Sequence, residues 1–408
     1  MLRLGLRILV LSPRQCFPPQ TGAKLREYYL IRSLSERADV THVSFDDPGG
    51  RLSAGDLPFC SAVISLPRPR GYTAGKVLRG LFGRWPLPIV NYSANAMQAV
   101  LAGLLAKERF DLIHLDSIHM AVYEPQLRRA TGAPVVYDWH NIESEMMFRY
   151  GRHTPSFLRA RYAALTAKRL SNLEDQILRT SLGHLVCSER EREELQRRVP
   201  EARITVVENG VDAKYFDGAA GGNSKHHRIV FVGAMSYHAN AEAAIYFARQ
   251  VWPEIHRQFP GWTLSIVGSN PTVEVLALHG RDNVEVTGTV ADVRPYYGDA
   301  AAAVVPLRVG GGTRLKILEA MAAGVPVIST ALGAEGLAVS PGKDILIANR
   351  EEEWRTHLES LAGDAGRWDA LSRAGRELVH SRYDWETLAR ALYDTYAEWL
   401  ASPRKLAS

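Results

Sequence analysis

Cysteine is scarce in this chain, with Cys16, Cys60 and Cys187 as its only three among 408 residues. Their number is odd and their spacing is wide. A disulfide framework and a paired zinc-ligand motif are therefore both excluded. This usage fits a reducing compartment best, and we expect a cytoplasmic protein.

Long hydrophobic runs are also missing. The early apolar run at residues 4–11 is interrupted by Arg7 and lacks a small-residue cleavage site. It is far shorter than the roughly 20 residues that cross a bilayer. We interpret it as a first β-strand rather than as a signal or anchor.

Motifs for several large function classes are absent as well. A net charge of +5 suits an anionic ligand, but it suits nucleic acid or anionic lipid equally well. The chain has no helix-turn-helix, RNA-binding aromatic signature or zinc-finger spacing, so we expect no nucleic acid partner. No Gly-x-Gly-x-x-Gly follows the first strand and no P-loop is present, which argues against a dinucleotide oxidoreductase and a nucleoside triphosphatase.

What the chain does contain is an alternation of short β-branched runs with helical stretches. Such alternation predicts an α/β fold with mostly parallel, doubly wound sheets covered by helices. The length favours two domains, and the pattern restarts after residue 209. We expect strands at residues 6–11, 40–45, 62–66, 112–115, 135–137 and 184–187, and then at 228–232, 264–267, 284–286, 302–305, 325–329 and 345–348.

The restart predicts a first domain over residues 1–208 and a second over 209–382. Residues 217–224 are rich in Gly, Ala, Asn and Ser, which is typical of an exposed linker. Ligands of such sheets bind outside the carboxyl ends of the strands. We therefore expect two Rossmann-like domains that face a central cleft.

The most informative segment follows the strand that ends near Pro306. Three glycines at 310–312 allow close backbone approach, and the helix that follows presents free amides and a positive dipole end to an anion. Arg314 and Lys316 in its first turn are locally unfavourable by roughly 0.3 to 1 kcal/mol. A bound diphosphate would compensate, whereas a flexible turn with solvated basic residues leaves the cost unexplained. Glu319 lies where it could accept hydrogen bonds from ribose, although a solvated or capping glutamate is the alternative.

The segment PLRVGGGTRLKILEAMAAGVPVISTALGAEGL resembles the donor-site signature of glycosyltransferase family 4 (group 1), a retaining family of the GT-B type. The stretches FVGAMSYHANAEAAIYF, ENGVD and SIVGSNP resemble other family motifs in the same order. The resemblance covers nearly the whole chain. It implies transfer of a sugar from a nucleotide-diphosphate sugar, and a terminal helix over residues 383–408 that returns to the first domain.

The resemblance also implies roles for individual residues. Glu319 would bind the donor ribose, and Gly311, Gly312 and Thr313 would meet the diphosphate and sugar. The loop at residues 18–22 would contact donor phosphate and acceptor, unless it is an ordinary strand-to-helix turn; we assign Gly22 to the donor and Gln20, Thr21 and Asn141 to the acceptor side. His140 is the catalytic candidate, with a purely structural histidine as the alternative.

Two departures from the family pattern affect the site. Gly311 stands eight residues before Glu319, where many members have a glutamate, and residues 234–240 lack the usual arginine and lysine. We expect Arg314 and Lys316 to supply the missing positive charges. The chain has no Asp-x-Asp sequence, so we expect neither a metal nor another cofactor.

Two basic segments lie outside these motifs. In residues 76–85 the apolar side chains fall on one helical stripe with Lys76, Arg79 and Arg84 outside it, and Arg68 and Arg70 lie upstream. We expect the segment 68–90 either to rest on an anionic membrane surface, near lipid-linked acceptors, or to pack on its own domain. The Arg-rich stretch 149–179 predicts one long solvated helix without chemistry.

The sequence therefore predicts a metal-independent, retaining glycosyltransferase of polysaccharide or glycoconjugate biosynthesis. Its acceptor would be a glycan or a lipid-linked molecule, and its location cytoplasmic or peripheral on the inner membrane face. A nucleotide-sugar epimerase or hydrolase on the same scaffold, or a noncatalytic nucleotide-sugar-binding protein, stays open. The sequence leaves the donor base, the sugar, the linkage and the oligomeric state undetermined.

Overall fold

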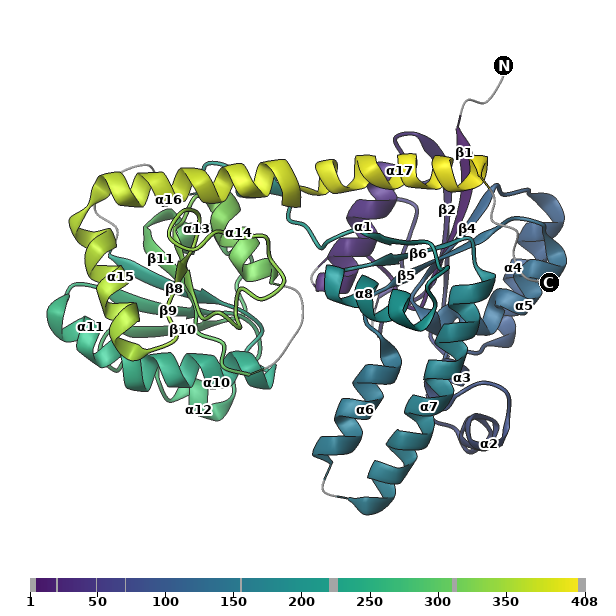
Figure 1. Cartoon of the computed structure of the whole chain (residues 1–408), viewed down its shortest axis with the longest axis horizontal. Coiled ribbons are helices and arrows are strands. Elements are labelled where there is room, and N and C mark those ends of the chain that lie inside the picture. The colour runs from purple at the N-terminus through teal and green to yellow at the C-terminus, as the bar shows by residue number, and fades with distance from the viewer. Residues whose placement is uncertain are drawn as a thin grey trace. The chain divides into compact units, whose positions relative to one another are not determined.

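A computed structural model describes residues 5–19, 21–48, 50–69, 71–154, 156–219, 227–309 and 314–402, apart from the side chain of His153. The chain forms two compact units (Figure 1). The first contains residues 1–208 together with 389–408, and the second contains residues 209–388. Each unit is an α/β structure with its own parallel sheet, which confirms the predicted fold class.

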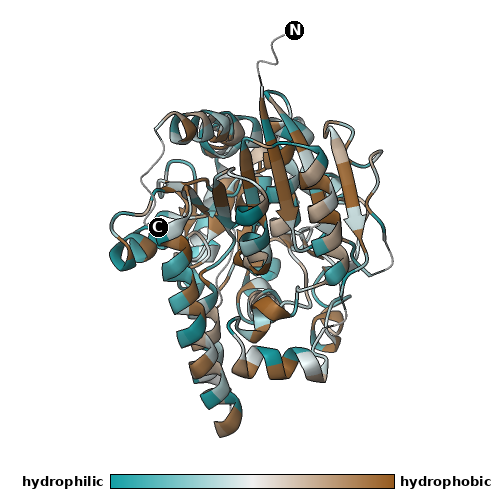
Figure 2. Cartoon of the chain, turned by 90° about the vertical axis from the view of Figure 1, so that its right-hand side faces the viewer, coloured by the Kyte–Doolittle hydropathy of each residue, from teal (hydrophilic) through white to brown (hydrophobic). Residues whose placement is uncertain are grey.

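The first unit is built on a seven-stranded parallel sheet with the order β3-β2-β1-β4-β5-β6-β7. Its central strands are almost fully buried, and brown, hydrophobic segments predominate among the strands in Figure 2. The sequence pattern missed β7, because its three residues are only half-buried and form no apolar run. The strands are β1 (Leu6–Ser12), β2 (Ala38–Phe45), β3 (Ala62–Leu66), β4 (Leu112–Asp116), β5 (Val135–Trp139), β6 (Gly183–Val186) and β7 (Ile204–Val206).

Helices connect these strands. They are α1 (Gly22–Leu34), α2 (Ala74–Phe82), α3 (Leu87–Val90), α4 (Asn95–Lys107), the 3-10 turn η1 (Ile118–Tyr123), α5 (Glu124–Ala130), α6 (Glu143–His153), α7 (Phe157–Thr180) and α8 (Glu189–Arg198). The predicted single helix over 149–179 is wrong. Thr154 has extended backbone angles, as expected before a proline, and α6 and α7 form a hairpin instead.

The prediction that this segment is wholly solvated is also wrong. The second half of α7 buries Leu170, Ile177 and Leu178 in the core of the first unit. In Figure 1 the other end of the α6–α7 hairpin projects away from the sheet of this unit, with α2 beside it.

The second unit has a six-stranded parallel sheet with the order β10-β9-β8-β11-β12-β13. Its strands are β8 (Arg228–Val232), β9 (Thr263–Val267), β10 (Val284–Gly288), β11 (Ala300–Val305), β12 (Val327–Ser329) and β13 (Leu346–Ile347). Its helices are α9 (Ala213–Phe216), α10 (His238–Tyr246), the π-turn η2 (Phe247–Val251), α11 (Trp252–Gln258), α12 (Val273–Leu276), α13 (Arg294–Gly298), α14 (Leu315–Ala323), α15 (Glu351–Gly363), α16 (Ala365–Leu378) and the π-turn η3 (Val379–Tyr383).

Two glycines bring the carboxyl ends of β8 and β9 into close contact. Gly268 has φ +152°, and a Cβ atom at this position would lie 1.8 Å from the carbonyl oxygen of Gly233. A Cβ atom at Gly233 would in turn lie 2.8 Å from the Asn240 side chain. No larger residue fits either position, which gives a physical reason for the glycines in FVGAMS and SIVGSNP.

The terminal helix α17 (Trp385–Ala401) begins in the second unit and ends in the first. The second unit thus extends to Leu388, six residues beyond the predicted end at 382. The linker prediction for residues 217–224 also needs correction. Val211, Ala213 and Phe216 are already buried in the core of the second unit, so the chain passes between the units at 208/209.

No helix within the described parts of the chain has both the length and the apolar character that crossing a membrane requires.

Candidate active site

A polar cluster lies at the carboxyl ends of β1, β4 and β5 in the first unit. Ser12 ends β1, Asp116 ends β4 and His140 follows β5. The Asp116 carboxylate accepts a hydrogen bond from His140 Nε2 at 2.8 Å and one from the Ser12 hydroxyl at 3.3 Å. Arg14 also contacts Asp116, at 3.3 Å. The strand order reverses between β1 and β4, and ligands of open α/β sheets bind at such a point.

The electrostatics of this cluster favour a charged His140 ring. Burial alone favours the neutral ring, but the adjacent Asp116 carboxylate outweighs it and raises the pKa of His140. The pKa of Asp116 is lowered, because His140 and Arg14 overcome the effect of its burial. Arg14 also lies 3.2 Å from His140 Nε2, but that nitrogen cannot accept from a guanidinium while it donates to Asp116. The contact with Asp116 therefore keeps a proton on Nε2.

A second carboxylate at the carboxyl ends of these strands belongs to a buried ion pair. Asp138, at the end of β5, accepts hydrogen bonds from the Arg26 guanidinium at 2.7 and 2.8 Å. Arg26 also donates to the backbone carbonyls of Val207 and Glu208. Burial would lower the pKa of Arg26, but Asp138 outweighs it and the pKa is raised. The Arg26–Asp138 pair therefore links α1 and residues 207–208 to the end of β5, which His140 follows.

The other candidates of the first unit lie nearby in the sequence but differ in environment. Thr21 precedes α1 without a side-chain capping bond, and Gly22 is the first residue of that helix. Asn141 is exposed next to His140. Gln20 lies outside the described residues.

Sequence reasoning missed Arg14 and Asp116. Asp116 ends the apolar run LIHL as Asp138 ends VVY, and this parallel could have identified it. Arg14 lies in a loop with no such signal, and only the fold places it beside His140.

The second unit offers positive charge at the start of α14. The Lys316 ammonium donates a 2.9 Å hydrogen bond to the Asn240 side-chain oxygen. Asn240 in turn donates to the Ala234 carbonyl at 2.9 Å. The ammonium therefore lies beside the loop after β8, the segment that lacks the family's arginine and lysine. Arg314 is directed elsewhere, because its Nε donates to the Glu335 carbonyl at 3.3 Å.

Two titratable groups on α14 have shifted pKa values. Burial lowers the pKa of Lys316 to about 8, against the opposing effect of Glu319. Burial raises the pKa of Glu319 to about 7, against the opposing effect of Lys316. Burial, and after it the Glu319 charge, raises the pKa of Tyr297, whose hydroxyl has no hydrogen-bond partner among the described residues.

Residues 310–313, which include the candidates Gly311, Gly312 and Thr313, lie outside the described residues. What the structure describes is the helix that follows, and its first turn contains no acidic residue.

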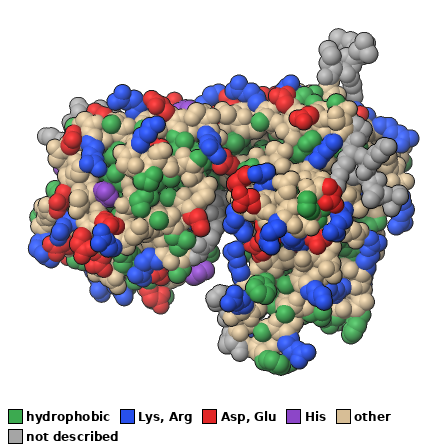
Figure 3. Space-filling view, in the orientation of Figure 1, with side chains coloured by type: hydrophobic (Ala, Val, Ile, Leu, Met, Phe, Trp, Pro, Cys, Tyr) green, Lys and Arg blue, Asp and Glu red, His purple; other side chains and the backbone are tan. Residues whose placement is uncertain are grey.

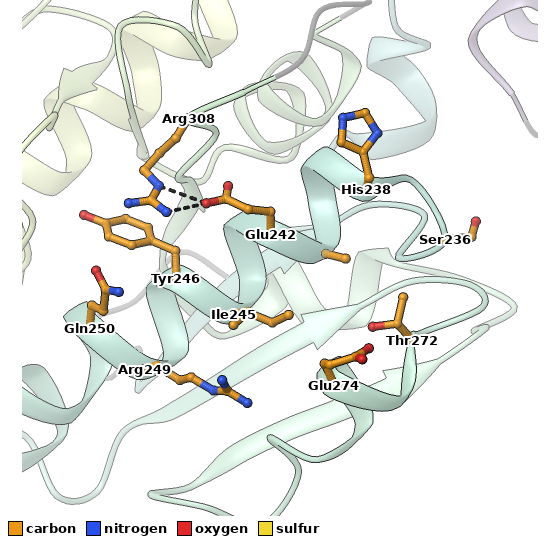
Figure 4. A pocket seen from close by; sticks show the side chains of 11 residues that line it. Ser236, His238, Glu242, Ile245, Tyr246, Arg249, Gln250, Thr272, Glu274 and Arg308 are labelled. Atoms are coloured by element: carbon orange, nitrogen blue, oxygen red, sulfur yellow. Dashed lines mark hydrogen bonds and ion pairs between the residues drawn. The ribbon is translucent and has the colours of Figure 1, made fainter. Parts of the chain in front are cut away.

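A cavity of about 480 Å³ lies in the second unit, and Lys316 and Glu319 are not among the residues that line it. Ser236, Thr272 and Arg308, which follow β8, β9 and β11, line one part of it, and α10 lines another. Figure 4 shows the Arg308 guanidinium paired with Glu242 and placed over the Tyr246 ring, at 4.0 Å from the ring centroid. Part of the cavity thus lies near the strand ends where a ligand of such a sheet is expected.

Two groups of side chains have ligand atoms within 4.8 Å of one another and could hold a metal: Cys16, Glu27 and His42, and His114, Asp116 and Asp138. In the second group the carboxylates are engaged, because Asp138 is paired with Arg26 and Asp116 with His140. In the first group His42 Nε2 lies 2.8 Å from Glu27, while His42 Nδ1 and the other Glu27 oxygen are buried without a partner among the described residues.

Comparison with known proteins identifies the chemistry of this scaffold. Residues 21–210 match the family model "Glycosyl transferase 4-like domain", and residues 226–364 match "Glycosyl transferases group 1". A glycogen synthase of Mycobacterium tuberculosis is 25% identical over 370 residues, which are 86% of this chain and 83% of that protein.

Two further comparisons add detail. A GDP-mannose-dependent alpha-(1-6)-phosphatidylinositol monomannoside mannosyltransferase of M. tuberculosis is 33% identical over 157 residues, 35% of this chain and 41% of that protein. The Anabaena protein Alr3699/HepE, solved with UDP and glucose, superimposes with a TM-score of 0.64 at 16% identity, over 96% of this chain and 99% of that one.

Proposed function

Because the chain is a glycosyltransferase of the GT-B fold, we propose that it transfers a sugar from a nucleotide-diphosphate sugar to a glycan or lipid-linked acceptor, with retention and without a metal. The relatives support the nucleotide-sugar donor, since one is GDP-mannose-dependent and a structural neighbour was solved with UDP. The placement of the Lys316 ammonium is the observation that supports the proposed site for the donor diphosphate.

The donor diphosphate binds at the amino-terminal end of α14. Lys316 is partly buried, and Asn240 holds its ammonium beside the loop after β8. The free amides of the helix start point in the same direction as its dipole, and no acidic side chain in the first turn opposes an anion. Lys316 thus supplies a charge that the family pattern places on the preceding loop. Arg314 adds to the local positive charge, although its guanidinium contacts Glu335.

Glu319 binds the donor ribose. It lies one turn beyond Lys316, where its ionised carboxylate can accept hydrogen bonds from two adjacent hydroxyls. Gly311, Gly312 and Thr313 contact the diphosphate and sugar, and Gly22 contributes from the first unit. Gln20, Thr21 and Asn141 form the acceptor side.

His140 positions the donor sugar at the reacting centre. Asp116 holds the ring through a 2.8 Å hydrogen bond and stabilises its charged form. The Nδ1 of such a ring remains available to donate a hydrogen bond to a sugar hydroxyl. This arrangement orients substrate and requires no covalent bond to the protein.

The chemistry consists of breaking the bond between the sugar and the diphosphate. Fixed amides and Lys316, with Arg314 adding only to the local positive charge, stabilise the charge that develops on the leaving diphosphate, and this role is what a metal would otherwise perform. The acceptor hydroxyl attacks from the face that the diphosphate leaves, and the phosphate takes its proton. The anomeric configuration is therefore retained.

The test compares Lys316→Met with Lys343→Met, which removes an exposed lysine from the same unit. We expect Lys316→Met to weaken UDP or GDP binding by at least tenfold in calorimetry and to lower turnover, because a charge-assisted contact contributes about 1.5 to 3 kcal/mol. Lys343→Met should behave as wild type. Equal nucleotide affinity of all three proteins would contradict the proposal.

Two controls address the remaining parts of the proposal. Activity should survive EDTA, and its loss would refute metal independence. Product should form only when acceptor is present, because turnover of the donor alone would indicate an epimerase or hydrolase. NMR of the product's anomeric centre tests retention.

A further inference from the structure

Large apolar side chains are exposed on three helices of the first unit. Phe82 on α2 is 83% exposed, and Leu158 and Phe157 at the start of α7 are 77% and 71% exposed. Single exposed apolar residues are common, but a group of them indicates an interaction site. We name this group the apolar–basic surface; its apolar members are Leu78, Leu81, Phe82, Met146, Phe148, Tyr150, Phe157, Leu158 and Leu165.

The three helices are joined into one structural element. Arg169 of α7 donates hydrogen bonds to the carbonyl oxygens of Gly80, Leu81 and Gly83 and so caps the carboxyl end of α2. The α6–α7 hairpin and α2 lie at the same lower end of the first unit in Figure 1. From the sequence, the apolar stripe of residues 76–85, in and after α2, is expected either to pack on its own domain or to rest on a membrane. The structure leaves Leu78, Leu81 and Phe82 exposed, which removes the first explanation for these residues.

The same segments are free of acidic residues. No Asp or Glu occurs in residues 57–107 or in residues 146–173. The basic residues there are Arg68, Arg70, Lys76, Arg79, Arg84 and Lys107 in the first stretch, and Arg149, Arg152, Arg159, Arg161, Lys168 and Arg169 in the second. In Figure 3 blue and green side chains occupy the lower end of the first unit, and red side chains appear higher up.

Two arginines of this surface lie beside its aromatic rings. The guanidinium of Arg161 is 5.7 Å from the centroid of the Phe157 ring, and that of Arg152 is 5.8 Å from the centroid of the Phe148 ring. An aromatic ring next to a cation is the arrangement that fits a membrane interface, where the ring enters the acyl boundary and the cation meets a headgroup phosphate.

We propose that the apolar–basic surface docks the enzyme on an anionic lipid bilayer, with Phe157 and Leu158 entering the interface and the surrounding arginines contacting headgroups. A bilayer fits better than a protein partner because the apolar side chains project from the end of a hairpin, and a fluid interface needs no complementary groove. The charge, uninterrupted by acids over two long stretches, complements anionic lipid.

Docking on a bilayer would serve the proposed transfer to a lipid-linked acceptor. Only this purpose rests on the proposed function, whereas the docking surface itself does not. A lipid-linked acceptor is confined to the bilayer, so an enzyme held at that surface meets it at a raised local concentration. Binding to vesicles is independent of catalysis and can be measured without any substrate.

The experiment uses co-sedimentation of the full chain with phosphatidylcholine vesicles that contain or lack phosphatidylglycerol. We expect binding only to the anionic vesicles and its loss at high salt. The double variant Phe157→Ser/Leu158→Ser should bind at least tenfold more weakly. Arg159→Glu/Arg161→Glu should lose still more, because each basic residue contributes roughly fivefold and each replacement also adds repulsion.

The matched control is Val273→Ser/Leu276→Ser, which removes an exposed apolar pair from α12 of the second unit. It should bind as wild type. A second double variant, Leu78→Ser/Phe82→Ser, tests α2 separately, and thermal melting checks that every variant is folded. Absence of wild-type binding, or equal binding by the hairpin variants and the control, overturns the proposal. Turnover of a soluble acceptor analogue should be unchanged in all of them, so a failure of docking is distinct from a failure of the transferase assignment.

Discussion

At the scale of single residues, Lys316 and Glu319 on α14 have pKa values shifted toward each other. Burial favours the neutral form of both, so the pKa of the lysine falls to about 8 and that of the glutamate rises to about 7. Below about pH 7 Glu319 is protonated and loses its capacity to accept from both ribose hydroxyls. Above about pH 8 Lys316 is neutral and no longer attracts a diphosphate.

We therefore predict that affinity for UDP or GDP is greatest between about pH 7 and 8. Above that range it should fall by up to about tenfold per pH unit, because binding must then take up a proton. Calorimetry in buffers of different ionisation enthalpy measures both affinity and proton uptake.

The conservative variant Lys316→Arg is the control, since a guanidinium stays charged in this range. It should retain affinity at alkaline pH, and Glu319→Gln should remove the acidic decline. An alkaline decline that persists in Lys316→Arg would assign the titration to another group.

Sequence reasoning reached some residues of the site and missed others. Lys316 and Glu319 could be proposed from the sequence because they belong to one contiguous motif with a local electrostatic argument, and their roles stay predictions. Arg14 and Asp116 were not, since their proximity to His140 depends on the order β1-β4-β5, in which strands distant in sequence are neighbours. The roles assigned to His140 and to the glycine loop stay predictions.

At the scale of elements, the strand alternation predicted both parallel sheets, while the helices were harder to define. The stretch 149–179 was predicted as one helix although it contains Pro155, and the break at Thr154 before that proline turns it into a hairpin. The spacing of its aromatic residues in the sequence does not distinguish a solvent-exposed helix face from a face that binds a partner. Only the fold reveals which of them are covered.

The contact between the ends of β8 and β9 gives an element-scale prediction. Gly268→Ala should destabilise the second unit by several kcal/mol, because its positive φ and the 1.8 Å approach to Gly233 both exclude a Cβ atom. Denaturant unfolding measures the change. Gly261→Ala, where a Cβ atom would meet nothing within 4 Å, should leave stability within about 0.5 kcal/mol. Similar stabilities for the two variants would show that the loops can separate without cost.

At the scale of the whole molecule, the first unit is completed by residues from the opposite end of the chain. Leu392, Tyr396 and Trp399 of α17 are buried, and the Tyr396 hydroxyl lies 2.6 Å from His114 Nδ1 on β4. The sequence indicated a returning helix only through its family resemblance. Nothing in the local pattern shows which sheet a terminal helix covers.

We predict that a chain ending at Leu388 has an unstable first unit although every candidate site residue is present. Loss of three large buried side chains costs several kcal/mol, comparable to the stability of a whole domain. Limited proteolysis should cut within residues 1–208, and vesicle binding should become nonspecific. A chain ending at Ser402 keeps the described contacts of α17 and should resist proteolysis as wild type does; equal resistance of both truncations would show that α17 is dispensable.

The discontinuity of the first unit also governs how the protein is made. Its first 208 residues leave the ribosome well before Tyr396 and Trp399, which are separated from them by the whole second unit. At roughly 5 to 20 residues per second this delay lasts on the order of 10 to 40 s. During that interval the nascent chain presents an incomplete hydrophobic core, so we expect its biosynthesis to depend on chaperones that cover the site of α17 until that helix has been synthesised.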